Sequence, residues 1–130
     1  MSIFQKLKGT PLENYVPLGK KGVVEELQVI DTVVGDGQEV PADATITAHY
    51  TGATCVDGIV FESSLDSGNP ATFGLNQVID GWTQGVPGMK VGGTRRLIIP
   101  SALAYGPRRA SAQIGPNSDL VFDIELIAVK

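Results

Sequence analysis

Apolar and polar residues alternate along two segments of the chain, Thr45–Tyr50 and Leu120–Val129. Successive side chains of a β-strand point to opposite faces, so this alternation predicts two strands that each direct one face at a core. In the second segment that face would carry four large apolar side chains, Leu120, Phe122, Ile124 and Leu126. A protein built around a half-buried sheet is therefore expected.

Runs rich in β-branched and aromatic residues predict the remaining strands. These are Val23–Ile30 continuing toward Val34, Ile59–Phe61, Thr72–Leu75 and Thr94–Ile99. Gly35-Asp36-Gly37 supplies turn residues, and Asp57-Gly58 predicts a hairpin. Two stretches rich in polar residues, Gly and Pro are expected to be loops, Glu62–Pro70 and Ser101–Ser118.

One segment has the periodicity of a helix rather than that of a strand. The apolar residues that recur there at roughly helical spacing are Val78, Ile79, Trp82 and Val86. Asn76 is expected to cap a helix that begins near Gln77, and Pro87-Gly88 is expected to end it after about three turns. About five mostly antiparallel strands with one helix on one face make an α+β architecture.

The first residues differ from the rest and predict an N-terminal appendage, residues 1–21, before a domain of residues 22–130. Pro11 and Pro17 interrupt this appendage, and Phe4–Lys8 is expected to form one short helix or turn. The sequence leaves open whether the appendage packs on the domain. Met1–Lys20 holds no apolar run long enough for a signal peptide or a membrane span. A cytoplasmic location is therefore expected, although removal of a leader would leave the same sequence.

Composition narrows the kinds of partner and of chemistry. A length of 130 residues favours one domain, and a net charge of −4 argues against nucleic acid or an anionic membrane as the main partner. The single cysteine, Cys55, excludes an internal disulfide and a Cys-rich zinc site. Because the chain has no phosphate-binding glycine motif, no HExxH motif and no paired CxxC, neither a metal nor a cofactor is expected.

A hydrolase with a Ser–His–Asp arrangement could use only His49, the one histidine of the chain. This residue lies on the polar face of a predicted strand, where a solvated imidazole is expected. The hydrolase hypothesis is therefore weak, and an activity that survived His49→Ala would dismiss it.

Aromatic residues are placed in an unusual way. Six of the eight fall at strand ends, at the helix or in a loop: Tyr50, Phe61, Phe73, Trp82, Tyr105 and Phe122. An ordinary core explains Phe73 and Phe122 as well as a binding site does. Tyr105 is harder to explain in this way, because it lies in a loop rich in Gly and Pro rather than on a periodic face.

Seven short motifs fall in a recognisable order. They are His49-Tyr50-Thr51-Gly52, Asp57–Ser64, Val78-Ile79-Asp80-Gly81-Trp82, Gly92-Gly93-Thr94, Pro100–Gly106, Ile114-Gly115-Pro116-Asn117 and Leu120–Leu126. With this order and spacing the chain resembles an FKBP-type peptidyl-prolyl cis-trans isomerase over roughly Gly22 to Lys130. It looks closest to the bacterial branch that includes the macrophage infectivity potentiator proteins. The resemblance implies an antiparallel sheet wrapped around a short helix, with an apolar pocket between them.

The resemblance also implies roles for individual residues. The catalytic residues would be Tyr50, Phe61, Glu62, Tyr105 and Phe122, and the substrate-binding residues would be Phe73, Val78, Ile79, Trp82 and Ile114. Trp82 would form the floor beneath the proline ring. The Ile79 backbone N–H and the Tyr105 hydroxyl would hold carbonyl oxygens of the bound peptide.

The implied function is acceleration of cis–trans rotation about Xaa-Pro bonds in proline-containing polypeptides, which assists protein folding without a covalent step. Macrolides such as rapamycin are possible ligands, and a monomer is expected. The alternative is a binding or chaperone module of the same fold with weak or no isomerase activity. Departures from the family pattern bear on substrate preference and macrolide affinity. They are Glu62 in place of Asp, Ala71 in place of an aromatic residue, and a polar flap that contains Arg108, Arg109, Ala110 and Gln113.

Overall fold

The computed structural model describes residues 8–19 and 22–130. Its sheet contains the six strands β1 (Gln28–Val33), β2 (Thr45–Thr54), β3 (Val60–Ser63), β4 (Ala71–Gly74), β5 (Thr94–Ile99) and β6 (Leu120–Val129). One α-helix, α1 (Asp80–Gly85), and two single turns of 3-10 helix, η2 (Ser64–Asp66) and η3 (Ser101–Leu103), complete the described elements. Sheet and helix together confirm the predicted α+β class. No helix in the described residues is long and apolar enough to cross a membrane.

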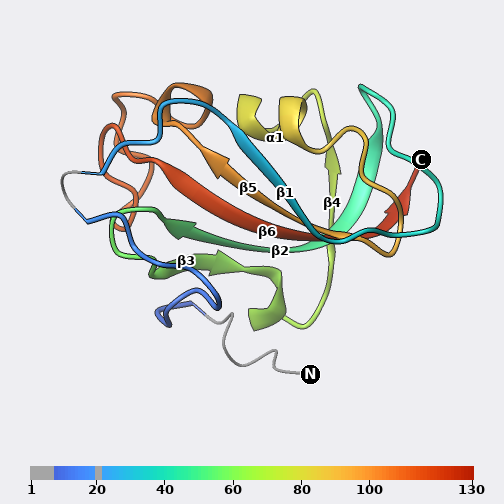
Figure 1. The fold of residues 1–130 in the computed structure, drawn as a ribbon, viewed down its shortest axis with the longest axis horizontal. Coiled ribbons are helices and arrows are strands. Elements are labelled where there is room, and N and C mark those ends of the chain that lie inside the picture. The colour runs from blue at the N-terminus through green and yellow to red at the C-terminus, as the bar shows by residue number, and fades with distance from the viewer. Residues whose placement is uncertain (1–7, 20–21) are drawn as a thin grey trace.

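All strand pairs of the sheet are antiparallel, in the order β1-β5-β6-β2-β3, and β4 also pairs with β2. The long strands β2 and β6 lie at the centre, and α1 lies against one face (Figure 1). Along one of its edges, β2 changes partner. Its first half pairs with β4 as far as Ala48, opposite Ala71, and its second half pairs with β3 from Thr51, opposite Ser63.

Several strands begin and end where the alternation predicts. β5 and β6 have the predicted bounds, whereas β2 continues four residues past Tyr50 to Thr54. The strand predicted from Val23 begins only at Gln28. Val24 instead donates its backbone N–H to the Asp119 carboxylate at 2.9 Å, so a side chain takes the place of a strand ladder there.

The helix is shorter than the predicted three turns. It begins at Asp80 after the extended residue Ile79, and no side chain caps it, so the prediction that Asn76 is the cap is wrong. The residues before it form a turn in which the Gln77 N–H donates to the Gly74 carbonyl. Two loop predictions also need correction, because the first loop begins as strand and then forms η2, and the second contains η3.

Glycines let α1 approach the sheet closely. A Cβ at Gly81 would lie 2.5 Å from Ile99, and one at Gly85 would lie 2.7 Å from Leu97. Real Cβ atoms do not approach heavy atoms so closely, so only glycine permits this separation. The helix therefore rests directly on β5 and holds Trp82 against the sheet.

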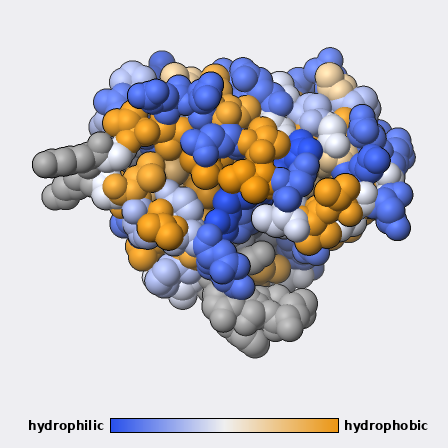
Figure 2. Space-filling model, viewed as in Figure 1, coloured by the Kyte–Doolittle hydropathy of each residue, from blue (hydrophilic) through white to orange (hydrophobic). Residues whose placement is uncertain are grey.

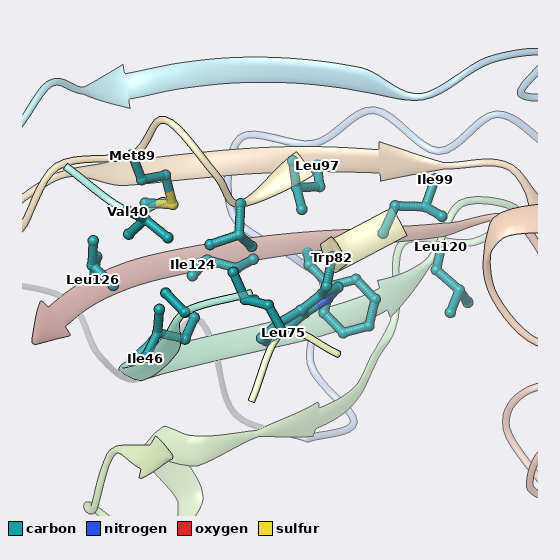
Figure 3. Close-up of a cluster of buried hydrophobic side chains, with 14 of the residues drawn as sticks. Val40, Ile46, Leu75, Trp82, Met89, Leu97, Ile99, Leu120, Ile124 and Leu126 are labelled. Carbon is teal, nitrogen blue, oxygen red and sulfur yellow. The ribbon is translucent and has the colours of Figure 1, made fainter. Parts of the chain in front are cut away.

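The inner face of the sheet, toward α1, carries the main core. The apolar face predicted for β6 is buried there, with Leu120, Ile124 and Leu126 fully inaccessible and Phe122 5% exposed. Figure 3 shows Trp82 and Leu75 beside side chains from β2, β5 and β6.

The outer face is covered by the N-terminal strap, defined here as residues 8–19. Leu12 of the strap is 4% exposed and packs in a second cluster with Ala53, Val60 and Val121. Val60 of β3 accepts a hydrogen bond from Gly9, and its own N–H donates to the strap, so the strap runs beside β3 (Figure 1). The described part of the predicted appendage thus packs on the sheet. The turn or helix predicted for Phe4–Lys8 lies outside the described residues, apart from its last residue.

Arg96 fastens the strap to the sheet. Its guanidinium forms a bidentate ion pair with Asp123, with N–O distances of 2.7 and 2.8 Å. The remaining N–H groups donate to the carbonyl oxygens of Glu13 and Asn14, at 2.7 and 2.6 Å. The Tyr15 ring lies 5.8 Å from the guanidinium carbon, within the range of a cation–π contact. One buried cation therefore joins β5, β6 and the strap.

At the opposite edge of the sheet, β1 is exposed along its whole length. Its apolar residues are more than two-fifths exposed, with Val29 at 46%, Ile30 at 43% and Val33 at 53%. Figure 2, in the view in which β1 lies in front, shows several separate apolar patches interrupted by polar surface. Isolated patches of this kind are normal on a folded protein.

Candidate functional site

A pocket of about 410 Å³ opens between the N-terminus of α1, the strands β2, β3 and β4, and the loop after η3. Its lining is mostly aromatic and aliphatic with a few polar groups, which is typical of a site for a small apolar group. The lining residues are Tyr50, Glu62, Phe73, Gln77, Val78, Ile79, Trp82, Tyr105 and Phe122. Eight of the ten residues predicted for the site are among them.

Four of the aromatic rings that line this pocket pack together, and Phe61 adds a fifth ring beside it. Trp82 is central, with its ring centroid 5.1 Å from Phe73, 5.4 Å from Phe122 and 5.7 Å from Tyr50. Phe61 contacts Phe122 at 5.8 Å, and all of these pairs are edge-to-face. Such pairs contribute about 0.5–1.5 kcal/mol each beyond their burial, so the cluster is a rigid apolar surface.

Trp82 contributes only its ring surface. It is 4% exposed, and its indole N–H has no hydrogen-bond partner among the described residues. A buried Trp N–H usually finds an acceptor, so this unpaired donor is unusual. The arrangement favours an apolar floor over a polar contact.

Tyr50 and Glu62 place polar groups at the rim. Burial, the nearby negative charge of Glu62 and a hydrogen bond with that carboxylate raise the pKa of Tyr50 to about 12. The phenol therefore stays neutral at ordinary pH and donates to Glu62. This contact orients both side chains on the side of the pocket where β3 ends.

Tyr105 lies near Glu62 on a loop that backbone hydrogen bonds hold in place. The Gly106 N–H donates to the Ser101 carbonyl at 2.8 Å, and the Ser101 N–H donates to the Asp119 carboxylate at 2.9 Å. The side chain is 42% exposed, and its hydroxyl has no hydrogen-bond partner within the described segments. Burial, followed by the charge of Glu62, raises the pKa of Tyr105. The hydroxyl is thus a neutral donor aimed at the pocket mouth.

The backbone at the start of α1 offers a second donor. Ile79 is extended, and its carbonyl accepts from Trp82 and Thr83 in the first turn of the helix. Within the described ranges no acceptor binds its N–H. Two donors, the Ile79 N–H and the Tyr105 hydroxyl, therefore have no partner within the described residues and remain available to a ligand.

Two predicted residues lie beside the pocket rather than in it. Phe61 and Ile114 line an adjoining, more polar pocket of about 390 Å³, which shares Glu62 and Tyr105 with the first. The two pockets therefore adjoin at Glu62 and Tyr105. Gln77 also lines the main pocket and was not predicted, and its position directly before Val78 was the only signal in the sequence.

His49 is not the solvated side chain expected from its position. It is half-buried, and its Nδ1 atom lies 2.9 Å from the Ser64 hydroxyl. The prediction failed because η2, which carries Ser64, folds over this part of β2. Cys55 is buried at 2% exposure, and burial raises the pKa of its thiol to about 11.

Several named proteins are similar in sequence to most of this chain. The chain is 44% identical over 117 residues to a probable FKBP-type peptidyl-prolyl cis-trans isomerase, FkpA, of Neisseria meningitidis. This match covers 90% of this chain and 43% of that protein. It is 45% identical over 105 residues to the outer membrane protein MIP of Legionella longbeachae, covering 81% and 44%. It is 46% identical over 107 residues to an FK506-binding protein of Streptomyces anulatus, covering 80% and 86%. The chain thus spans less than half the length of the first two relatives.

A solved structure shares the fold. The crystal structure of a peptidyl-prolyl cis-trans isomerase from Pseudomonas syringae superposes with a TM-score of 0.73 at 38% identity, covering 85% of this chain and 83% of that one. The sequence model of FKBP-type peptidyl-prolyl cis-trans isomerases matches residues 36–127, which include every residue predicted for the site. The chain belongs to the FKBP-type peptidyl-prolyl cis-trans isomerase family.

Proposed function

We propose that this protein catalyses cis–trans isomerisation of Xaa-Pro bonds in other polypeptides, with the proline ring seated on Trp82. The observation that carries the proposal is the aromatic pocket with two free donors at its mouth, the Ile79 N–H and the Tyr105 hydroxyl. Family membership supports the same reaction. The relatives' names concern proteins that are in part much longer, so the activity of this chain has to be measured directly.

The reaction needs rotation about a partial double bond and no proton transfer. Rotation costs about 18–20 kcal/mol, and an uncatalysed Xaa-Pro bond isomerises in tens to hundreds of seconds. Amide resonance separates charge between O and N, and water stabilises that separation. A ring enclosed by Trp82, Phe122 and Phe73 loses water around its amide nitrogen, which favours the twisted form in which the resonance is lost.

Positioning supplies the second contribution. With the ring held in the pocket, carbonyl oxygens on the two sides of the bond accept from the Ile79 N–H and the Tyr105 hydroxyl. Contacts that are stronger in the twisted geometry lower the barrier, and each 1.4 kcal/mol of such preference gives about a tenfold rate. Glu62 acts indirectly, because it holds the Tyr50 hydroxyl.

Macrolide binding is a further part of the proposal. A relative of similar length is named an FK506-binding protein, and the pocket of about 410 Å³ is large enough for a saturated ring of proline size with its substituents. Ala71, half-buried on β4, and the exposed flap residues Arg108 and Arg109 are expected to set the affinity.

The experiment is an isomerisation assay with an Ala-Leu-Pro-Phe peptide, with and without rapamycin. Catalysis that the macrolide abolishes supports both the reaction and the pocket. A folded protein that binds the macrolide without catalysis favours a binding or chaperone module of the same fold. Tyr105→Ala and Phe122→Ala are both expected to lower the rate, and unchanged rates in both would contradict the pocket assignment.

A further inference from the structure

The edge of β2 has a gap next to the pocket. On this edge β2 pairs with β4 as far as Ala48 and with β3 only from Thr51, so the two residues between them, His49 and Tyr50, have no strand partner there. Tyr50 is a pocket residue, and an unpaired backbone at this point would leave it free to shift. Buried backbone groups that lack a partner also cost free energy.

A single hydroxyl fills the gap. The Tyr50 backbone N–H donates to the Ser64 Oγ at 2.8 Å, and that Oγ lies 3.3 Å from the Tyr50 carbonyl oxygen, to which it can donate. Ser64 is 7% exposed and is the first residue of η2. Ser63 holds η2 in place. Its hydroxyl forms a hydrogen bond with the Thr51 hydroxyl at 3.0 Å and accepts from the Leu65 N–H at 3.2 Å.

His49 decides where the single hydrogen of Ser64 goes. The Nδ1 atom of His49 lies 2.9 Å from the Ser64 Oγ, closer than the Tyr50 carbonyl. When Nδ1 carries no proton, Ser64 donates to the ring. When Nδ1 carries one, the ring donates to Ser64, and the hydroxyl hydrogen turns to the Tyr50 carbonyl. In both arrangements Ser64 accepts from the Tyr50 N–H.

We propose that Ser64 and His49 are positioning residues that hold the Tyr50 backbone across the gap. They thereby fix the Tyr50 ring against Trp82 and Phe73, and its hydroxyl against Glu62. The inference deepens the proposed function and rests on it, because Tyr50 matters for isomerisation only if the pocket binds the proline. Neither residue lines the pocket or the one that adjoins it.

The test compares Ser64→Ala and His49→Leu with the wild-type protein. Two properties are measured, the amide hydrogen exchange of Tyr50 by NMR and the kcat/KM for the Ala-Leu-Pro-Phe peptide. Ser64→Ala is expected to speed exchange at Tyr50 roughly tenfold or more and to lower kcat/KM about fivefold, because it leaves the Tyr50 N–H unpaired. His49→Leu is expected to have a smaller effect, with exchange at Tyr50 about threefold faster and kcat/KM about twofold lower. His49→Asn, whose amide can reach the Nδ1 position, is expected to restore the wild-type values.

Ser67→Ala is the matched control. Ser67 lies in the same turn and bonds the Ser64 carbonyl and the Asn69 N–H, but it does not contact Tyr50. Wild-type exchange at Tyr50 in Ser67→Ala, with faster exchange in Ser64→Ala, supports positioning by the Ser64 hydroxyl. Equal effects of the two variants would overturn the inference, and so would wild-type exchange in both Ser64→Ala and His49→Leu.

The two readouts separate this inference from the proposed function. If the wild-type protein does not isomerise the peptide, the proposed function fails, whereas Tyr50 exchange still reports on the backbone hydrogen bond. If Ser64→Ala fails to fold, the pair His49→Leu and His49→Asn decides the question. Faster exchange in the first and recovery in the second support the inference, and no difference between them overturns it.

Discussion

The two faces of the sheet are both closed, but by different means, and the aromatic pocket lies on the inner one. On the inner face a helix of six residues rests on β5 and leaves the end of the sheet near Tyr50 uncovered. On the outer face the strap follows β3, and Arg96, which is itself paired with Asp123 of β6, donates to two carbonyl oxygens of the strap. The short helix thus covers only part of the inner face and leaves room for the aromatic pocket beside it.

Both faces hold a buried cation, but on the inner face its partner is exposed: Arg95, 8% exposed, pairs with Asp31, whose side chain is 39% exposed. The inner face places aromatic rings around its opening, with Glu62 at the rim. The outer face buries a full ion pair, in which the side chains of Arg96 and Asp123 are each 11% exposed. Buried charges are costly when one partner is lost, so the outer face should be the more sensitive to single substitutions in stability, and the inner face in catalysis.

The largest effect is expected from Arg96→Ala. It leaves the Asp123 carboxylate buried without its cation and frees two strap carbonyls, so the free energy of unfolding should fall by about 3 kcal/mol. Urea denaturation measures the loss, and limited proteolysis should locate new cleavage in the strap. Arg108→Ala, at an exposed position of the flap, serves as the control and should change stability little. Equal stability of the two variants would contradict the role given to Arg96.

Trp82→Leu should lower stability by about 2 kcal/mol through the cavity it creates. Catalysis should fall only a few-fold, because Trp82 supplies an apolar floor and its N–H binds nothing in the described structure. The change tests whether catalysis tolerates the loss of apolar ring surface better than the loss of a hydrogen-bond donor such as the Tyr105 hydroxyl. A fall in kcat/KM of a hundredfold, measured well below the melting temperature, would contradict the floor assignment.

Tyr105→Phe should leave stability unchanged and lower kcat/KM about tenfold, which corresponds to about 1.4 kcal/mol. The ring remains, and only the hydroxyl at the pocket mouth is lost. Tyr15→Phe is the matched change on the outer face, where the hydroxyl donates to the Cys55 carbonyl at 3.0 Å. It should lower stability slightly and leave kcat/KM unchanged. A catalytic loss in Tyr15→Phe would mean that the two faces are coupled.

The smallest effect on stability at ordinary pH is expected from Cys55 and Tyr50, two groups that folding keeps neutral. Burial raises the pKa of Cys55 from 9.0 to about 11 and that of Tyr50 from 10.0 to about 12. A group whose pKa is raised by folding contributes stability below its unfolded pKa, and this contribution is lost as pH rises through the folded value. The unfolding free energy should therefore decline between about pH 9 and 12. Cys55→Ala should flatten the decline between pH 9 and 11, and an unchanged slope would show that the thiol does not contribute.

The sequence predicts the sheet best where one face of a strand is buried and the other is not. β5 and β6 satisfy this condition, and their predicted bounds match the structure. The helix was predicted too long because Val78 and Ile79 lie before α1 and line the pocket. Their apolar character therefore reflects the pocket and not a face of the helix. A pattern of apolar residues does not distinguish these two uses.

The site was predicted from motifs, and its missing parts depend on contacts between distant segments. Gln77 has no property of its own that marks a pocket residue. The bond between His49 and Ser64 joins residues 15 positions apart, and the Asp119 carboxylate joins Val24 to Ser101. Local periodicity carries no information on such contacts, which is why His49 was expected to be solvated.

The divided pairing of β2 also bears on the behaviour of the protein at high concentration. An exposed strand edge with a continuous row of backbone groups is a template for aggregation. Here the edge formed by β3 and β4 is interrupted at His49 and Tyr50, the strap already occupies the free side of β3, and an irregularity after Asp31 interrupts the register of β1. The break in the ladder beside the pocket thus denies a second chain a long edge on which to add a strand.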